Sequence, residues 1–298
     1  MDAESQQNHL KAYGITYWVL SKQQKVQWLG NDRGGSFLLP DGETIRRECQ
    51  IRGVSFEVLS DGQAEAILDE ISSPSQNQDA VILEKAPKIA VYSPKGNQPW
   101  DDAVTMVLTY AEIPYATVYD EEVLDDKLVL YDWLHLHHED FTGQYGKFYG
   151  AYRAAPWYIE DKRKAEELAQ RLGFSKVSEE KRAVALKIRN YVIGGGFMFA
   201  MCSATDSFDI ALAAENVDIC EPMFDGDPSD ANYQGKLDFS RTFAFTNFLL
   251  ERNPLRYEFS SIDMTNKRRN VPKESDYFSL MEFSAKWDPV PTMLTQNH

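Results

Sequence analysis

The sequence is poor in cysteine and in long apolar runs. It has three cysteines, Cys49, Cys202 and Cys220, and no pair with CxxC spacing. An odd count without that spacing excludes a disulfide framework, although one bridge between two of them stays open. No run reaches the about 18 apolar residues of a membrane-spanning helix, so we expect a chain that does not span a membrane. The first residues also lack the basic and then apolar pattern of a signal peptide.

Basic residues are scarce relative to acidic ones. The 298 residues include 31 Lys and Arg against 46 Asp and Glu, which gives a net charge of −15. This charge opposes attraction to nucleic acid or to an anionic membrane, so neither is expected as a partner. The 43% of apolar residues in a chain of this length predicts a globular protein of one large or two small domains.

The first part of the chain mixes helical and strand-like patterns. Strands are expected where β-branched and aromatic residues concentrate, and helices where the polar segments carry spaced apolar residues. The expected strands are 14–20, 54–60 and a pair within 26–39, and the expected helices are 2–12, 41–52 and 63–71. The polar segment 72–78 marks a boundary. Residues 1–78 are therefore predicted to form an N-terminal α/β extension to a main domain at 79–298.

The main domain alternates between apolar strands and amphipathic helices. The expected strands are 88–94, 115–120, 131–138 and 197–202, and the clearest helices are 101–112, capped by Asp101, and 179–193. This alternation predicts a flavodoxin-like, doubly wound parallel sheet. Ligands of such sheets bind beyond the carboxyl ends of the strands. Three of those ends carry polar side chains, around Trp100 and Asp101, around His137, and around Cys202.

Cys202 lies between the last strand and a helix expected to begin near Asp206 or Ser207. A helix N-terminus offers unpaired N–H groups and partial positive charge, which favour a thiolate and can hold an oxyanion. Buried cysteine is also common as a small apolar residue. The sequence leaves both interpretations open.

Three of the five histidines lie in the segment HLHHED. His135 and His137 share one face of the predicted strand, His138 faces the other way, and Glu139 follows. His135, His137 and Glu139 suit a zinc or iron site, a catalytic base or substrate contact, or a structural role, and we expect no bound metal. The segment SATDS lacks the adjacent glycines of a pyrophosphate loop, so no nucleotide or other cofactor is expected.

Several segments carry a resemblance to a known family. The order helix, Gly194–Gly196, strand, Cys202 resembles the class I glutamine amidotransferase-like fold, and within it the trehalose-utilisation-like group. The segments AYGITYW, YDWLHLHHEDFTGQYGKFY, GGGFMFAMCSATDSFDIALA and CEPMFDGDP are similar to a Bacteroidetes family that genomes often label asparagine synthetase B. The label does not suit the chain, since asparagine synthesis requires an N-terminal cysteine nucleophile and a pyrophosphate loop.

The resemblance implies a cysteine hydrolase or acyl transferase acting at a carbon–nitrogen bond. Cys202 would be the nucleophile, and His138 or Glu139 would position substrate or proton. The implied substrate contacts are His137, Ser203, Asp206, Trp100 and Asp101, and the implied ligand is small and polar.

The chain departs from the family pattern. Ala204 stands where these enzymes have glycine, and the only histidine after Cys202 is His298. Family members continue into a Gly-His-Asp-Pro-Glu segment that could supply the base, so we expect this chain to be incomplete at its C-terminal end and inactive alone. The alternative is a non-enzymatic binding or assembly protein with a protein partner in the cell envelope. Family members begin with a signal peptide, which implies a periplasmic rather than a cytoplasmic location.

Overall fold

The computed structural model describes residues 6–95 and 102–263. These residues form two compact units. The first unit contains residues 6–87 and 102–115, and the second contains residues 88–95 and 116–263. Among the described residues, no helix combines the length and the apolar character that crossing a bilayer requires.

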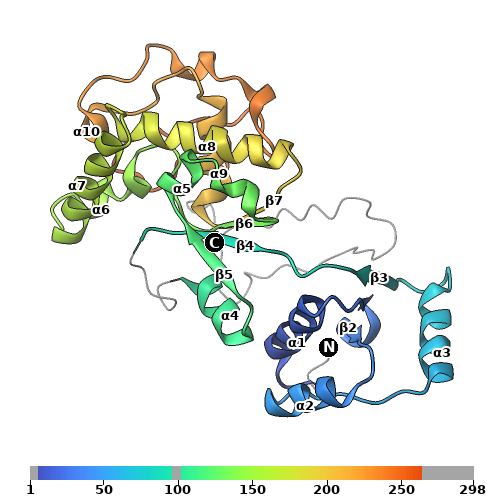
Figure 1. The fold of residues 1–298 in the computed structure, drawn as a ribbon. Coiled ribbons are helices and arrows are strands. Elements are labelled where there is room, and N and C mark those ends of the chain that lie inside the picture. Colours follow the sequence, from blue (N-terminus) through green and yellow to red (C-terminus); the bar gives the residue numbers. More distant parts are fainter. Residues whose placement is uncertain (1–5, 96–101, 264–298) are drawn as a thin grey trace. The chain divides into compact units, whose positions relative to one another are not determined.

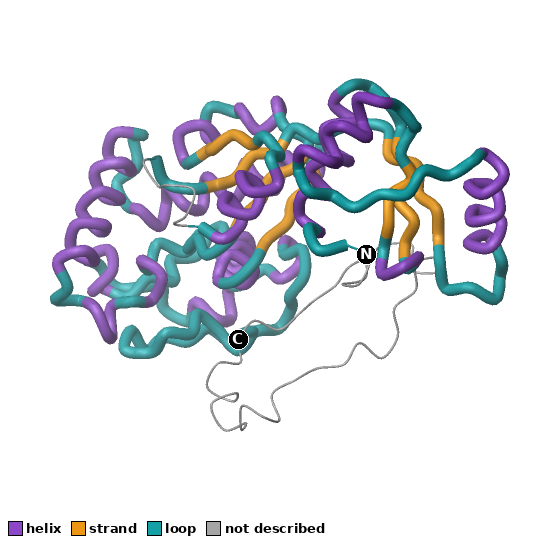
Figure 2. Tube along the Cα trace, turned by 90° about the horizontal axis from the view of Figure 1, so that it is seen from below, coloured by secondary structure: helices purple, strands orange, loops and turns teal. Residues whose placement is uncertain are grey.

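The first unit is built on a small antiparallel sheet of order β2-β1-β3. Its strands are β1 (Val26–Gly30), β2 (Ser36–Leu38) and β3 (Asp79–Leu83), which lie side by side in Figure 2. Its helices are α1 (His9–Ser21), α2 (Glu43–Ile51), α3 (Asp61–Ser72) and α4 (Ala103–Ala111), with a short turn η1 (Asp32–Gly34). Because β3 pairs with β1, this unit continues past residue 78 as far as Pro87.

Two strand predictions in this unit are wrong. Residues 14–20 belong to helix α1, and residues 54–60 form no regular element. The apolar residues of α1 follow helical spacing: Ala12, Ile15 and Val19 are all buried and pack in one core with Val26 and Cys49. Tertiary burial of that face outweighs the β-branched and aromatic content that favoured a strand. The helix predicted at 2–12 begins only at His9.

Gly14 lets helices α1 and α4 approach closely. A Cβ at Gly14 would lie 1.9 Å from the carbonyl oxygen of Ala111, an impossible contact unless the helices separate. Gly62 in α3 has nothing within 4 Å of such a Cβ.

We therefore expect Gly14→Ala to lower the free energy of unfolding by about 1–3 kcal/mol, the usual cost of overpacking. Gly62→Ala is the matched control and should be neutral or stabilising by up to about 1 kcal/mol, because alanine favours the helix. Urea denaturation of both variants measures the difference. Equal stabilities of the two would contradict the close helix approach.

The second unit contains a four-stranded parallel sheet of order β5-β4-β6-β7. The strands are β4 (Ile89–Tyr92), β5 (Tyr115–Val118), β6 (Trp133–Leu136) and β7 (Phe197–Ala200). In chain order this is 2-1-3-4, the flavodoxin-like arrangement, so the predicted fold class is confirmed. The remaining elements are α5 (Asp120–Leu124), η3 (Lys127–Leu130), η4 (Tyr145–Lys147), α6 (Tyr149–Tyr152), α7 (Pro156–Arg171), α8 (Val177–Ile193), α9 (Ser203–Ala213), α10 (Pro222–Asp225), η5 (Tyr233–Lys236) and η6 (Phe239–Arg241).

Helices α5, α8 and α9 cover one face of this sheet (Figure 1). The sheet contributes alternate residues to that face, as the pleat requires. The main core contains Ala90, Tyr92, Val118, Val123, Leu134, Leu136, Phe141, Val184, Ile188, Phe208 and Leu212, all of them buried. This packing fixes the positions of the loops that follow β6 and β7.

A buried ion pair lies inside this core. Lys181 of α8 donates from Nζ to Oδ2 of Asp120 at 2.6 Å, and both side chains are at least 90% buried. The Tyr92 hydroxyl also donates to Asp120. The ammonium of Lys181 lies 4.5 Å from the ring centre of Tyr119. The charges of Lys181 and Asp120 therefore compensate each other.

Removing Asp120 should leave the Lys181 charge buried without compensation. We expect Asp120→Ala to lower the free energy of unfolding by about 3–5 kcal/mol. Asp126→Ala is the control, since Asp126 forms an exposed pair with Lys187 at 2.6 Å, and such pairs contribute about 0–1 kcal/mol. Thermal and urea denaturation test the contrast, and a loss below about 1 kcal/mol for Asp120→Ala would refute it.

Candidate functional site

Cys202 sits at a sharp turn between β7 and α9. Strand β7 ends at Ala200 and α9 begins at Ser203, so Cys202 is the N-cap of the helix. The helix begins three residues earlier than the earliest start expected from the sequence, Asp206. The backbone of Cys202 has φ 51° and ψ −140°, a conformation that non-glycine residues rarely adopt. Strain of this kind at a strand-to-helix turn is typical of a nucleophile elbow.

Backbone hydrogen bonds hold this elbow against the neighbouring strand. The amide of Met201 donates to the carbonyl of Leu136 at 3.0 Å, and the amide of Ala204 donates to the carbonyl of His137 at 3.3 Å. The ends of β6 and β7 are therefore adjacent, as the sequence predicted for the carboxyl edge of the sheet. Ala204 is fully buried and is part of the main core. Ser203, the first residue of α9, has an amide without a partner inside the helix.

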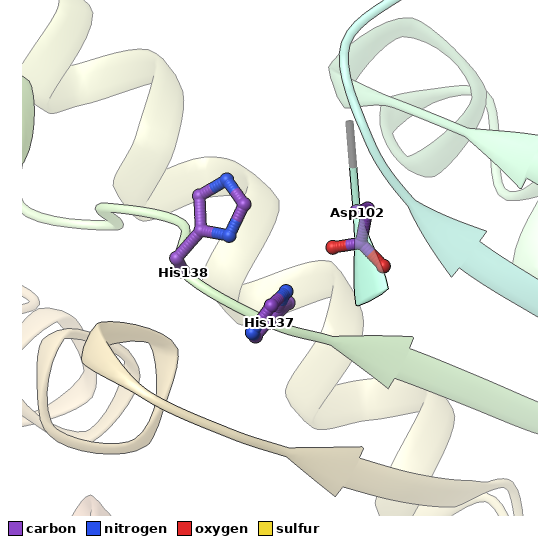
Figure 3. A group of neighbouring side chains, drawn as sticks. All are labelled: Asp102, His137 and His138. Atoms are coloured by element: carbon purple, nitrogen blue, oxygen red, sulfur yellow. The ribbon is translucent and has the colours of Figure 1, made fainter. Parts of the chain in front are cut away.

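His137, His138 and Glu139 follow β6 directly, and Figure 3 shows the two imidazoles at that strand end. The ring centres of His137 and His138 are 4.7 Å apart. Oε2 of Glu139 accepts a hydrogen bond from the His137 amide at 2.7 Å, so Glu139 fixes the loop. His135 is buried within β6 and its ring stacks on Phe199, 5.7 Å away.

Trp100 and Asp101 lie outside the described residues. The predicted cap of helix α4 by Asp101 is wrong by one residue. Oδ1 of Asp102, also labelled in Figure 3, accepts hydrogen bonds from the amides of Val104 at 2.7 Å and Thr105 at 3.0 Å. Asp102 belongs to the first unit, and its carboxylate satisfies the helix amides there.

Asp206 lies one helical turn after Cys202 and is 6% exposed. Its Oδ2 has no hydrogen-bond partner among the described residues. Burial, and then the negative charge of Asp263, raise the pKa of this carboxyl to about 7. A carboxyl that titrates near neutral pH beside a strained cysteine can give or take a proton.

Tyr257 is a member of this neighbourhood that the sequence did not reveal. Burial raises the pKa of its hydroxyl, and electrostatic interactions with Cys202, Asp263 and Asp206 raise it further. Tyr257 follows Cys202 by 55 positions and belongs to no motif, so only the folded chain brings the two together.

The other two cysteines are buried and free. Burial raises the pKa of Cys49 and holds the pKa of Cys220 well above its usual value. Cys220, Asp218 and Asp225 place potential metal-ligand atoms within 4.8 Å of one another. Nζ of Lys176 lies 2.9 Å from Asp218 and 3.2 Å from Asp225 and neutralises these carboxylates. A metal ion there would have to displace this ammonium.

Comparison of the chain with protein-family models, with curated proteins and with solved structures finds no match. The resemblance to amidotransferase-like proteins therefore stays a prediction from the sequence motifs.

The neutral carboxyl of Asp206 predicts how stability depends on pH. Its folded pKa of about 7 exceeds the ordinary value of 3.8, so the folded chain retains a proton that the unfolded chain loses. The contribution of Asp206 to the free energy of unfolding is complete below pH about 4 and is lost as the pH rises through 7. The total loss is roughly 4 kcal/mol. Asp206→Asn should therefore gain stability relative to the wild type between pH 4 and 8. Urea denaturation across this range tests it, and a constant difference would contradict a buried neutral carboxyl.

Proposed function

We propose that this chain is an amidotransferase-like protein whose site is centred on Cys202. The reaction class is hydrolysis or acyl transfer at a carbon–nitrogen bond, with Cys202 as nucleophile. The observation that carries the proposal is the strained conformation of Cys202 at the junction of β7 and α9. The junction also lies at the carboxyl edge of a parallel sheet, where such folds bind ligands.

The chemistry follows from these positions. The thiolate of Cys202 attacks the carbonyl carbon, a C–S bond forms, the C–N bond breaks, and the leaving nitrogen takes a proton. Water or another acceptor then cleaves the thioester and restores the thiol. The Ser203 amide and the N-terminus of α9 face the developing oxyanion. Asp206, with a pKa of about 7, carries the proton at this site.

The histidine loop has a supporting role in this proposal. His138 is exposed and remains the candidate to position substrate or proton, and His137 is the candidate substrate contact. Glu139 acts through the loop, because its carboxylate holds the His137 amide.

A binding or assembly protein that retains the fold is the second candidate. Ala204, fully buried at the start of α9, stands where the family motif has glycine. This departure from the nucleophile motif favours a site that binds a small polar ligand without turnover. For both candidates, the enzyme and the binding protein, the family resemblance favours a periplasmic location and a protein partner in the cell envelope.

Cys202 should be the most reactive thiol of the folded protein. Cys49 and Cys220 are 2% and 0% exposed, whereas Cys202 is partly accessible at the elbow. Limited iodoacetamide treatment at neutral pH, followed by peptide mapping, should label Cys202 first. The urea-unfolded protein, in which all three thiols are accessible, provides the control. Preferential labelling of Cys49 or Cys220 in the folded protein would overturn the proposed nucleophile.

A further inference from the structure

Three carboxylates of the second unit surround the ammonium of Lys176. Oxygens of Asp218, Asp225 and Asp227 lie 2.9, 3.2 and 2.5 Å, respectively, from its Nζ. Within residues 6–95 and 102–263, these carboxylates form no ion pair with any other basic side chain. Three carboxylate oxygens this close to one point define a position for a cation.

The loop that carries these carboxylates is held by bonds that do not involve the ammonium. The amide of Asp218 donates to Oδ2 of Asp230 at 3.0 Å, and the amide of Asp230 donates to the carbonyl oxygen of Asp218 at 2.8 Å. Nζ of Lys162 donates to the carbonyl oxygen of Phe224 at 2.9 Å. Gly226 has φ 95°, a conformation that suits glycine, and turns the chain between two of the carboxylates. The positions of the carboxylates therefore do not depend on the ammonium alone.

A cavity of about 180 Å³ adjoins this group, which is room for several water molecules. The residues that line it include Tyr145, Glu166, Lys176 and Asp225. The side chain of Asp225 is 5% exposed, and its Oδ1 accepts no hydrogen bond from the part of the chain that the structure describes. A buried acceptor without a donor is costly, and this one points to an ion or ligand at the cavity wall.

We propose that the three carboxylates form a weak calcium site, in which Ca²⁺ displaces the ammonium of Lys176. The carboxylates provide oxygen ligands, and water in the cavity completes the about six to eight that Ca²⁺ takes. The displaced ammonium turns into the cavity that Lys176 already lines. There it meets the carboxylate of Glu166, whose own ion pair with Lys162 is long, at 3.7 Å. The site does not include Cys202, so the inference goes beyond the proposed function and does not depend on it.

The ligand atoms favour a hard cation over zinc. Sγ of Cys220 lies within 4.8 Å of carboxylate oxygens of Asp218 and Asp225. The thiol donates to the carbonyl oxygen of Thr142 at 3.1 Å, so it is engaged as a protonated group. Zinc binds cysteine as the thiolate, whereas Ca²⁺ is bound by oxygen atoms. Mg²⁺ requires a stricter octahedral geometry and loses its water reluctantly, so Ca²⁺ suits these carboxylates best.

Calorimetric titration of the full chain with CaCl₂ at physiological ionic strength tests the inference. We expect the wild type to bind one Ca²⁺ with a Kd of about 0.1–1 mM, the range of weak calcium sites. Lys176→Met removes the competing ammonium at similar side-chain length and should bind Ca²⁺ at least about tenfold more tightly. Lys176→Arg keeps the charge and should bind no more tightly than the wild type. No binding by the wild type, or equal affinities of the wild type and Lys176→Met, would overturn the proposal.

A carboxylate variant locates the ion in the Lys176→Met background. Asp227→Asn removes the most exposed of the three carboxylates and should weaken Ca²⁺ binding by about tenfold or more. Asp126→Asn is the matched control, since Asp126 is an exposed carboxylate paired with Lys187, and it should leave the affinity unchanged. Ca²⁺ should also raise the melting temperature of Lys176→Met more than that of the wild type, which separates lost binding from lost folding. Equal effects of the two carboxylate variants would show adventitious binding and refute the site.

Discussion

Burial of helix α9 is the constraint on which the site depends. Nine of its eleven residues are buried, with Phe208 and Leu212 in the main core and Ile210 and Ala213 in a second apolar cluster. The carboxylate of Asp209 accepts hydrogen bonds of 2.8 Å from the amides of three successive residues, Phe243, Ala244 and Phe245. Because α9 is held by this packing, it cannot shift to relax its N-cap residue, and the positive φ of Cys202 persists.

The buried ionisable side chains of the second unit differ in whether they are fully partnered. Lys181 and Asp120 compensate each other inside the core, where Tyr92 and Tyr119 surround them. Glu180, Asp206 and Glu258 are also buried, and within the described part of the chain each has a side-chain oxygen without a hydrogen-bond partner. The first arrangement stabilises the packing of α8 on the sheet. The second costs stability, and burial raises the pKa of Glu180 and of Asp206, which favours their neutral forms.

The sequence predicted the main sheet well because its strands are short apolar runs between amphipathic helices. Strands β4 to β7 all fall within predicted segments, and their order follows the rule for parallel sheets. The prediction failed in α1, where GITYWVL has strand-like composition and helical spacing at once. Only the packing of Ile15 and Val19 in the core of the first unit decided that this segment is a helix and not a strand. The cap of α4 moved from Asp101 to Asp102 because residue preference does not fix a helix boundary to one position.

By itself, the sequence determined that Cys202 joins a strand to a helix and that the histidine loop shares its edge of the sheet. Both facts follow from local pattern and from the direction of parallel strands. Only the tertiary structure decided that α9 begins at Ser203, and that Tyr257 interacts with both Cys202 and Asp206. The raised pKa of Asp206 depends on its burial and on the charge of Asp263, which lies 57 positions further along the chain. Because desolvation is a property of the packed protein, the raised pKa of Asp206 could be recognised only in the folded structure.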